Sequence, residues 1–258
     1  MPLLKTPRLT LNYRLDGADG APVLVLSNSL GTDLDMWAVQ MPELVRHFRV
    51  LRYDTRGHGG SAIVPGPFGV AELGRDVLDL MDGLDIARAH FCGLSMGGMT
   101  GMWLGLNAPG RFDRLVLCNT AAKIGTAEQW DLRIARVELA GTVSVAEAVL
   151  ERWFTPEFMA ARPDVVGAAR ATLESTSAAG YAASCAAVRD MDQRAAIADI
   201  RLPTLVIAGT HDLATPPAAG REVARNIPGA RYLELDAAHL SNLEQAEQFT
   251  AALLEFLR

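Results

Sequence analysis

The stretch Phe91-Cys92-Gly93-Leu94-Ser95-Met96-Gly97-Gly98-Met99 decides the fold of this chain, because it places a serine in a G-x-S-x-G motif between two apolar segments. Residues 89–94 predict a buried strand, and residues 99–106 predict a helix with small residues at its start. Ser95 is therefore expected at a sharp turn from strand to helix, which exposes its hydroxyl and strains its backbone. The motif alone also fits a tight turn with an inert serine, but this context predicts a catalytic nucleophile.

A serine hydroxyl is a weak nucleophile, so it needs a histidine base and an acid that orients the base. His239 is the candidate base among the five histidines of the chain. It follows an apolar strand predicted over residues 230–235 and a short loop, and it precedes a helix predicted over residues 242–257. Loops that follow parallel strands gather at the carboxyl edge of the sheet, where Ser95 is also expected.

Asp212 is the candidate acid, because it comes soon after a buried strand predicted over residues 204–208. The order of Ser95, Asp212 and His239 along the chain is one of the known orders of a serine triad. Two alternatives remain, since Asp212 could cap the following helix and Asp236 could compete as the acid. Asp236 is so close to His239 in sequence that we expect it to shape the loop instead.

Two backbone N–H groups are candidates for an oxyanion hole, which stabilises the negative charge of a tetrahedral intermediate. The N–H of Met96 begins the helix after the serine. The N–H of Leu30 lies in the loop over residues 28–31, of sequence Asn-Ser-Leu-Gly, which follows a strand predicted over residues 23–26. A histidine-glycine pair is usual in a loop with this role, and this chain departs from it. The alternative interpretation of residues 28–31 is an ordinary polar turn that leads into a helix predicted over residues 35–45.

Length and composition limit the class of protein. The chain has 258 residues, 50% of them hydrophobic, which suits one domain with an insertion better than two domains. Its formal charge of -6 disfavours nucleic-acid binding. We find no run apolar enough to span a bilayer, so we expect a soluble cytoplasmic protein without a membrane partner. The sequence leaves the oligomeric state open.

The cysteines and histidines indicate neither disulfides nor a metal site. Cys92, Cys118 and Cys185 are odd in number and lack C-x-x-C spacing, so we interpret them as reduced thiols of the core. The histidines lack the spacing of metal ligands, and the chain has no glycine-rich phosphate loop. We therefore expect that no metal and no organic cofactor is needed.

Strands and helices alternate over the first half of the chain, which predicts a mostly parallel sheet with helices on both faces. Residues 9–15 alternate apolar and polar side chains like an edge strand. Further strands are predicted over residues 49–53 and 114–119, and a helix is predicted over residues 70–84. The turn at residues 54–61 is rich in glycine and charge, and we assign it to the scaffold.

The alternation stops between residues 121 and 197, where only helical patterns occur. Helices are predicted over residues 130–140 and 178–188. Between them, residues 144–147, of sequence Ser-Val-Ala-Glu, resemble a capping box that starts another helix.

This break predicts two parts in the chain. We expect residues 1–120 and 193–258 to form the core, and residues 121–192 to form an all-helical lid inserted into it. The lid is expected to cover the carboxyl edge of the sheet, where Ser95 lies. A lid in that position would control the entry and the selection of the substrate.

Four stretches carry a resemblance to known proteins. They are Ser27-Asn28-Ser29-Leu30-Gly31-Thr32 with Met36-Trp37; Tyr53-Asp54-Thr55-Arg56-Gly57-His58-Gly59; Phe91-Cys92-Gly93-Leu94-Ser95-Met96-Gly97-Gly98; and Thr120-Ala121-Ala122-Lys123-Ile124-Gly125 followed by Trp130 and Arg133. On these residues the sequence resembles the α/β-hydrolase fold family over almost its whole length, and within it the family of 3-oxoadipate enol-lactonases. The order of serine, acid and histidine is common to the whole fold family, whereas the first and last stretches are typical of a narrower group within it.

The resemblance implies hydrolysis of 3-oxoadipate enol-lactone, a small anionic lactone, to 3-oxoadipate in the β-ketoadipate pathway of aromatic catabolism. Ser95 would form an acyl-enzyme with His239 as the base. The candidate substrate-binding residues are Ser29, Trp130 and Arg133. One alternative is a general carboxylesterase or a cofactor-free perhydrolase that uses the same triad. Another, from a different class, is a lactone receptor with very slow turnover.

An acidic chain that takes an anionic lactone needs a local cation to meet the substrate carboxylate. Trp130, Ile134 and Val137 form an apolar stripe on the first lid helix, and we expect this stripe to face the site. Arg133 lies at the border of the stripe and is the candidate anchor. If Arg133 is only a solvated side chain, Arg136 is an equal candidate.

Overall fold

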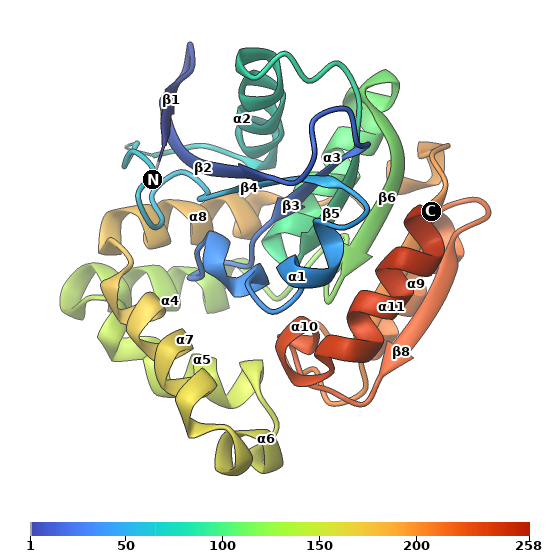
Figure 1. Cartoon of the computed structure of the whole chain (residues 1–258). Coiled ribbons are helices and arrows are strands. Elements are labelled where there is room, and N and C mark those ends of the chain that lie inside the picture. The colour runs from blue at the N-terminus through green and yellow to red at the C-terminus, as the bar shows by residue number, and fades with distance from the viewer. Residues whose placement is uncertain (1, 65) are drawn as a thin grey trace.

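The computed structural model describes residues 2–64 and 66–258 of the chain. These residues form one sheet of eight strands, shown with its surrounding helices in Figure 1. In chain order the strands are β1 (Leu3–Lys5), β2 (Thr10–Asp16), β3 (Val23–Ser27), β4 (Arg49–Tyr53), β5 (Ala89–Leu94), β6 (Phe112–Cys118), β7 (Thr204–Gly209) and β8 (Arg231–Leu235).

The helices follow the strands in the alternation that the sequence predicts. Short 3-10 helices also occur at Leu34–Trp37, Pro109–Arg111, Thr142–Val145 and Ile197–Asp199. The α-helices are α1 (Met41–Leu44), α2 (Val70–Gly83), α3 (Met96–Asn107), α4 (Ala127–Ala140), α5 (Ala146–Trp153), α6 (Pro156–Ala161), α7 (Pro163–Ser175), α8 (Ala178–Asp190), α9 (Pro217–Asn226), α10 (Ser241–Glu244) and α11 (Ala246–Leu257).

The sheet is mostly parallel, as predicted. Its strand order is β1-β2-β4-β3-β5-β6-β7-β8, with β1 and β2 antiparallel to their neighbours and all later pairs parallel. Helix α3 packs against β5 and β6, and α2 packs on α3. Helices α1 and α11 pack together on the opposite face of the sheet (Figure 1). The central strand β5 is buried along its whole length, and it delivers Ser95 to the carboxyl edge.

Residues 121–192, all of which the structure describes, form helices and no strand. Helices α4 to α7 gather on one side of the sheet, and α8 runs between them and the core (Figure 1). Gly180 on α8 lies directly against Gly57 in the core turn, and a Cβ on either glycine would meet the backbone of the other. The helical segment is therefore in close backbone contact with the core.

The prediction of an edge strand over residues 9–15 was wrong about its position. Strand β2 lies between β1 and β4, and β1 forms the edge by pairing Leu3 with Asn12. A strand of three residues is too short to show a period of two in its sequence.

Three of the predicted helical features also differ in the structure. The helix expected over residues 35–45 is interrupted because Pro42 has no backbone N–H to continue it, so a 3-10 turn precedes α1. The capping box at residues 144–147 does not form, since Ser144 Oγ donates to the carbonyl of Gly141 at 2.6 Å. The helix expected over residues 242–257 is divided at Gln245 into α10 and α11.

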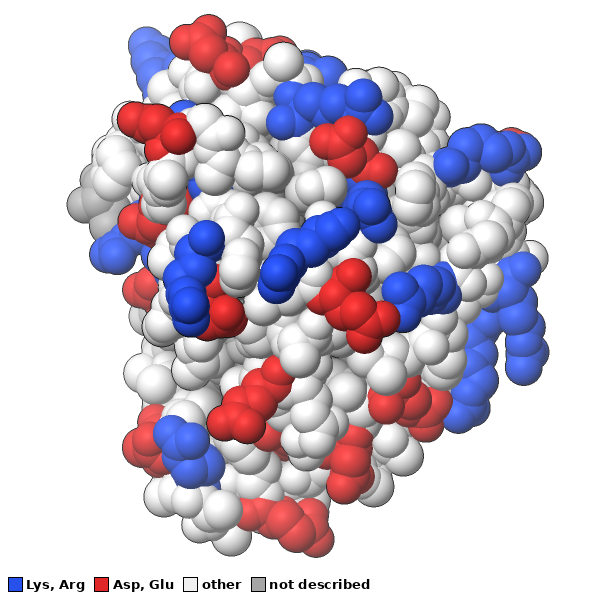
Figure 2. All heavy atoms as spheres, turned by 45° about the vertical axis from the view of Figure 1, so that its right-hand side comes forward, with Lys and Arg blue, Asp and Glu red and all other residues white. Residues whose placement is uncertain are grey.

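The surface and the core fit the composition. The three cysteines are buried and free, and burial raises the pKa of Cys118. Figure 2 shows basic and acidic side chains interspersed over the face that carries α9 and α11. Pairs such as Arg231 with Glu255, at 2.6 Å, account for part of this mixture. Among the described residues, no helix has the length and apolar character that a membrane span requires.

Candidate active site

Ser95 lies at the turn from β5 to α3 with φ +57° and ψ -113°, a conformation that is strained for a residue with a side chain. A Cβ on Gly93 would collide with the carbonyl oxygen of Gly97, and a Cβ on Gly97 would collide with that of Ser27. Glycine is therefore required on both sides of the serine, because strand and helix backbones meet there. The geometry is that of a nucleophile elbow, as the motif predicts.

Two hydrogen bonds from the neighbouring strand hold this turn. The N–H of Ser95 donates to the carbonyl of Cys118 at 2.8 Å, and the hydroxyl of Thr120 donates to the carbonyl of Ser95 at 2.8 Å. Both partners come from the end of β6. The strained serine is thus supported by bonds that the packed sheet supplies.

His239 and Asp212 form a buried pair. His239 Nδ1 lies 2.8 Å from Asp212 Oδ2, and the two residues are 2% and 1% exposed. Burial alone would raise the pKa of Asp212, but His239, the N–H of Thr215 and the amide of Asn119 together hold it below its usual value. Asp212 is therefore ionised at neutral pH, and it fixes the imidazole with Nδ1 protonated and Nε2 free to act as a base.

Asn119 is a further member of this cluster that the sequence analysis missed. It follows β6 with a positive φ of 45°, and its side-chain amide donates to Asp212 Oδ2 at 3.0 Å and to the carbonyl of Ala238 at 3.1 Å. Its side-chain oxygen accepts from Ser241 Oγ at 2.6 Å. Asn119 thus ties the acid to both ends of the histidine loop. The signal in the sequence was a polar residue at the end of a predicted buried strand, which places it at the carboxyl edge of the sheet.

The competing acid lies elsewhere. Asp236 Oδ1 is 2.7 Å from His211 Nε2 on the surface, and its backbone carbonyl accepts from Gln245 Nε2 at 2.8 Å. It therefore takes part in the structure of the loop rather than orienting His239, as expected.

Glu244 connects the histidine loop to the helical segment. Its carboxylate accepts from the N–H of Ala238 at 2.6 Å and from the N–H of Thr155 at 2.5 Å. The N–H of Leu240 also donates to the carbonyl of Trp153 at 3.0 Å. Burial raises the pKa of Glu244. These bonds hold the junction of α5 and α6 against the loop that carries His239.

The two candidate oxyanion donors come from the loop after β3 and from the first residue of α3. Within residues 2–64 and 66–258, neither the N–H of Leu30 nor that of Met96 has a hydrogen-bond partner. Asn28 fixes the Leu30 loop, because its side chain donates to the carbonyl of Tyr53 at 2.7 Å and accepts from Trp37 Nε1 at 2.9 Å. Unpaired N–H groups at this place are available to a ligand oxygen.

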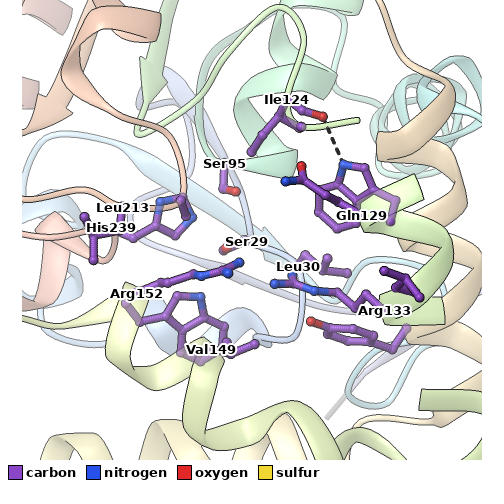
Figure 3. Close-up of a pocket in the computed structure, with 16 residues that line it drawn as sticks. Ser29, Leu30, Ser95, Ile124, Gln129, Arg133, Val149, Arg152, Leu213 and His239 are labelled. Carbon is purple, nitrogen blue, oxygen red and sulfur yellow. Dashed lines mark hydrogen bonds between the residues drawn. The ribbon is translucent and has the colours of Figure 1, made fainter. Parts of the chain in front are cut away.

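A cavity of about 510 Å³ lies between the core and the helical segment. Ser29, Ser95 and His239 line it from the core, and Trp130 and Arg133 line it from α4. Figure 3 shows the serine side chain and the imidazole side by side at one end of this cavity. The structure therefore brings the predicted serine, histidine and substrate-binding residues together around one space.

The arginines of the cavity differ in part from expectation. Arg133 lines the cavity and lies over the ring of Trp130 at 5.1 Å, while Trp130 Nε1 donates to the carbonyl of Ile124 at 2.9 Å. Arg136 is exposed and does not line the cavity, which favours Arg133 of the two candidates that the sequence left open. Arg152 on α5 lines the cavity instead, and the sequence analysis missed it. Its signal was an arginine beside a tryptophan, Trp153, at the end of a helix.

The two guanidinium groups point into the middle of the cavity from different helices (Figure 3). Neither Arg133 nor Arg152 forms an ion pair with a carboxylate of the described residues. Partial burial lowers the pKa of Arg152, and the charge of Arg133 lowers it further. Two facing cations without a paired carboxylate repel each other, so an anion between them would be stabilised. The cavity is thus locally basic in an acidic chain.

Known proteins resemble the chain over nearly its whole length. Residues 22–246 match the family described as alpha/beta hydrolase fold. The chain is 42% identical to 3-oxoadipate enol-lactonase 2 of Acinetobacter baylyi over 95% of this chain and 92% of that protein. The crystal structure of the enol-lactonase from Burkholderia xenovorans LB400 matches with a TM-score of 0.98, 51% identity and 99% coverage of both chains. A hydrolase from Pseudomonas aeruginosa PA01 matches with a TM-score of 0.97, 52% identity and coverage of 99% and 97%. The chain belongs to the α/β-hydrolase fold family.

Proposed function

We propose that this chain hydrolyses 3-oxoadipate enol-lactone to 3-oxoadipate through a serine acyl-enzyme. The observation that carries the proposal is the pair of guanidinium groups, Arg133 and Arg152, which face the same cavity as Ser95 without a carboxylate partner among the described residues. The enol-lactone carries one free carboxylate and one reactive ester carbonyl. A site with a basic end and a nucleophilic end matches both groups. The similarity to the enol-lactonases supports the same substrate.

The acylation step uses the serine and the histidine. His239 Nε2 takes the proton from Ser95 Oγ as the oxygen attacks the lactone carbonyl, and the ionised Asp212 stabilises the imidazolium that forms. The N–H groups of Leu30 and Met96 donate to the oxyanion of the tetrahedral intermediate. When the intermediate collapses, the ring C–O bond breaks and an enolate oxygen leaves. An enolate is a better leaving group than an alkoxide, so little acid assistance is needed for the ring to open. The enolate then takes up the proton of the His239 imidazolium and becomes the ketone, which leaves His239 neutral.

The second step releases the product. His239, again neutral, takes a proton from a water molecule that attacks the acyl carbonyl, and the same two N–H groups stabilise the second oxyanion. Collapse returns the proton to Ser95 Oγ and frees a dicarboxylate. The balance is one lactone and one water consumed, and one proton released to solvent, for each 3-oxoadipate dianion formed, so the reaction requires no redox partner.

The arginines would place the carbonyl over the serine. Arg133 lies over the ring of Trp130, and this contact reduces the side-chain entropy that Arg133 would lose on binding. Arg152 approaches from α5, so a carboxylate between the two receives donors from both sides. Ser29 lies at the core side of the same cavity and offers a hydroxyl to the lactone. In this role residues 121–192 act as the lid of the site, and residues 1–120 and 193–258 act as its core. A catabolic lactone of this kind suits a cytoplasmic enzyme.

A comparison of two substrates tests the proposal. The purified chain is assayed with the enol-lactone and with its methyl ester, which masks the free carboxylate and leaves the ring unchanged. We expect kcat/KM to be about ten- to a hundredfold higher for the acid, the usual effect of one hydrogen bond to a charged group. Equal or higher activity on the methyl ester would favour a general esterase or perhydrolase. Turnover of only a few molecules per enzyme would favour a lactone receptor.

A further inference from the structure

His58 lies in the glycine-rich turn at residues 54–61, which the sequence analysis assigns to the scaffold. Its side chain also contacts the loop that carries the candidate oxyanion donor Leu30. Its ring is 1% exposed. Nε2 accepts a hydrogen bond from the N–H of Gly31 at 3.0 Å, and Nδ1 lies 3.1 Å from the carbonyl of Arg56. One side chain thus joins the turn after β4 to the loop that carries Leu30.

The two contacts fix the protonation of the ring. A carbonyl oxygen only accepts, so Nδ1 of His58 carries the proton and Nε2 offers its lone pair to Gly31. Burial lowers the pKa of His58, against smaller opposing effects from the carbonyl of Arg56 and from Asp54, so the ring is neutral at neutral pH. The guanidinium of Arg56 is occupied with Asp76 through two bonds of 2.6 Å, which holds the carbonyl that His58 contacts.

The loop over residues 28–31 is therefore held from two sides. At the start of the loop, the side chain of Asn28 is bonded to the carbonyl of Tyr53. At its end, His58 accepts from the N–H of Gly31, whose φ of +83° favours glycine. Leu30 lies between these two anchors and lines the cavity, and its N–H has no hydrogen-bond partner among the described residues. A shift of the peptide that joins Leu30 to Gly31 would move that N–H relative to Ser95.

We propose that His58 is a positioning residue for the oxyanion hole, which aims the N–H of Leu30 through its bond to Gly31. The inference rests on the proposed serine mechanism, but it holds for any ester that the site accepts. His58 does not touch the substrate. It acts by keeping one donor where negative charge develops, and a donor that is misplaced by a fraction of an ångström loses most of its effect.

Two substitutions of equal length separate this role from packing. Glutamine in His58→Gln offers Oε1 near the position of Nε2, whereas methionine in His58→Met has a similar volume and no comparable acceptor. We expect His58→Met to lower kcat about ten- to a hundredfold, somewhat less than the complete loss of an oxyanion donor. His58→Gln should retain kcat within about threefold of the unchanged enzyme, since the N–H of Gly31 keeps its partner. His90→Gln, at a histidine remote from the cavity, should leave kcat unchanged.

The readout that a packing defect would not reproduce is the affinity for a trifluoromethyl ketone. This ketone adds to Ser95 and leaves an oxyanion in the hole, so its affinity should fall in His58→Met by the same factor as kcat. The inhibition constant of 3-oxoadipate should stay unchanged, because the arginines bind it. Equal losses in His58→Met and His58→Gln, or a parallel loss of 3-oxoadipate binding, would overturn the proposal. So would a kcat of His58→Met equal to that of the unchanged enzyme.

Two further measurements test the role of His58 even if the proposed substrate is wrong or the His58→Met variant does not fold. If the enzyme does not open the enol-lactone, the same variants are compared on a neutral p-nitrophenyl ester, so failure of the proposed substrate leaves the His58 test in place. If His58→Met does not fold, the ring nitrogens of His58 are observed by ¹⁵N NMR in the unchanged enzyme. A proton on Nδ1 is expected, and a proton on Nε2 would exclude the bond from Gly31 and overturn the proposal.

Discussion

The paired arginines of the cavity permit a quantitative test of substrate recognition. The changes are Arg133→Met and Arg152→Met, which keep most of the side-chain volume and remove the charge. Arg133 is half-buried and lies over the ring of Trp130, whereas Arg152 is more exposed, so screening by water weakens the attraction of Arg152 for the carboxylate more. A hydrogen bond to a charged group is worth about 1.5 to 3 kcal/mol. We assign the upper part of that range to Arg133 and the lower part to Arg152.

These values predict rates directly. Arg133→Met should lower kcat/KM for the enol-lactone by up to about a hundredfold, and Arg152→Met by about tenfold, since each 1.4 kcal/mol is a factor of ten. The double variant should lose the preference for the acid over its methyl ester. Because both guanidinium groups would hold one carboxylate, the two losses are not expected to add.

The assay measures hydrolysis of the acid and of its methyl ester by each variant. Arg136→Met is the matched control, because Arg136 lies on the same helix as Arg133 but outside the cavity. It should leave both rates unchanged. If Arg136→Met loses as much activity as Arg133→Met, or if Arg133→Met loses equally on the acid and the ester, the reasoning is refuted and the changes act on the fold of the lid.

Other predictions concern the catalytic triad, the need for a metal ion, and the buried His58. Ser95→Ala should lower kcat about 10⁶-fold with an unchanged circular dichroism spectrum, because no acyl-enzyme forms; a tenth of the activity remaining would remove the nucleophile. Asp212→Asn should cost about 10⁴-fold in the same assay, since His239 then favours the wrong tautomer; an unchanged rate would contradict its role. Exhaustive dialysis against a chelator should leave turnover unchanged, and a loss that one metal restores would contradict this. The free energy of unfolding should fall as the pH drops below about 6.5, by at most about 1.4 kcal/mol per pH unit from His58, because burial lowers its folded pKa and the unfolded chain binds the proton first. Guanidinium titrations at several pH values should find this component missing in His58→Gln.

The sequence by itself determined the parts of the protein that depend on local pattern. The strand, turn and helix around Ser95 follow from an apolar run, small residues and a helix start within a short segment, and the structure has β5 over the predicted residues. Asp212 and His239 were predictable because loops after parallel strands must meet at one edge. The parallel sheet and the helical segment over residues 121–192 follow from the same periodicity.

The tertiary structure alone decided the contacts between segments that are distant in sequence. Arg152, Asn119 and His58 lie in unremarkable local patterns. Their importance appears only when Arg152 borders the cavity, Asn119 contacts Asp212 and His58 contacts Gly31. The same holds for Arg136, which lies about one turn from Arg133 on the same helix, since only packing decides which of the two borders the cavity. Periodicity reports which side of an element is apolar. It carries no information on which distant element covers that side, and the catalytic contacts of this protein are made between such distant elements.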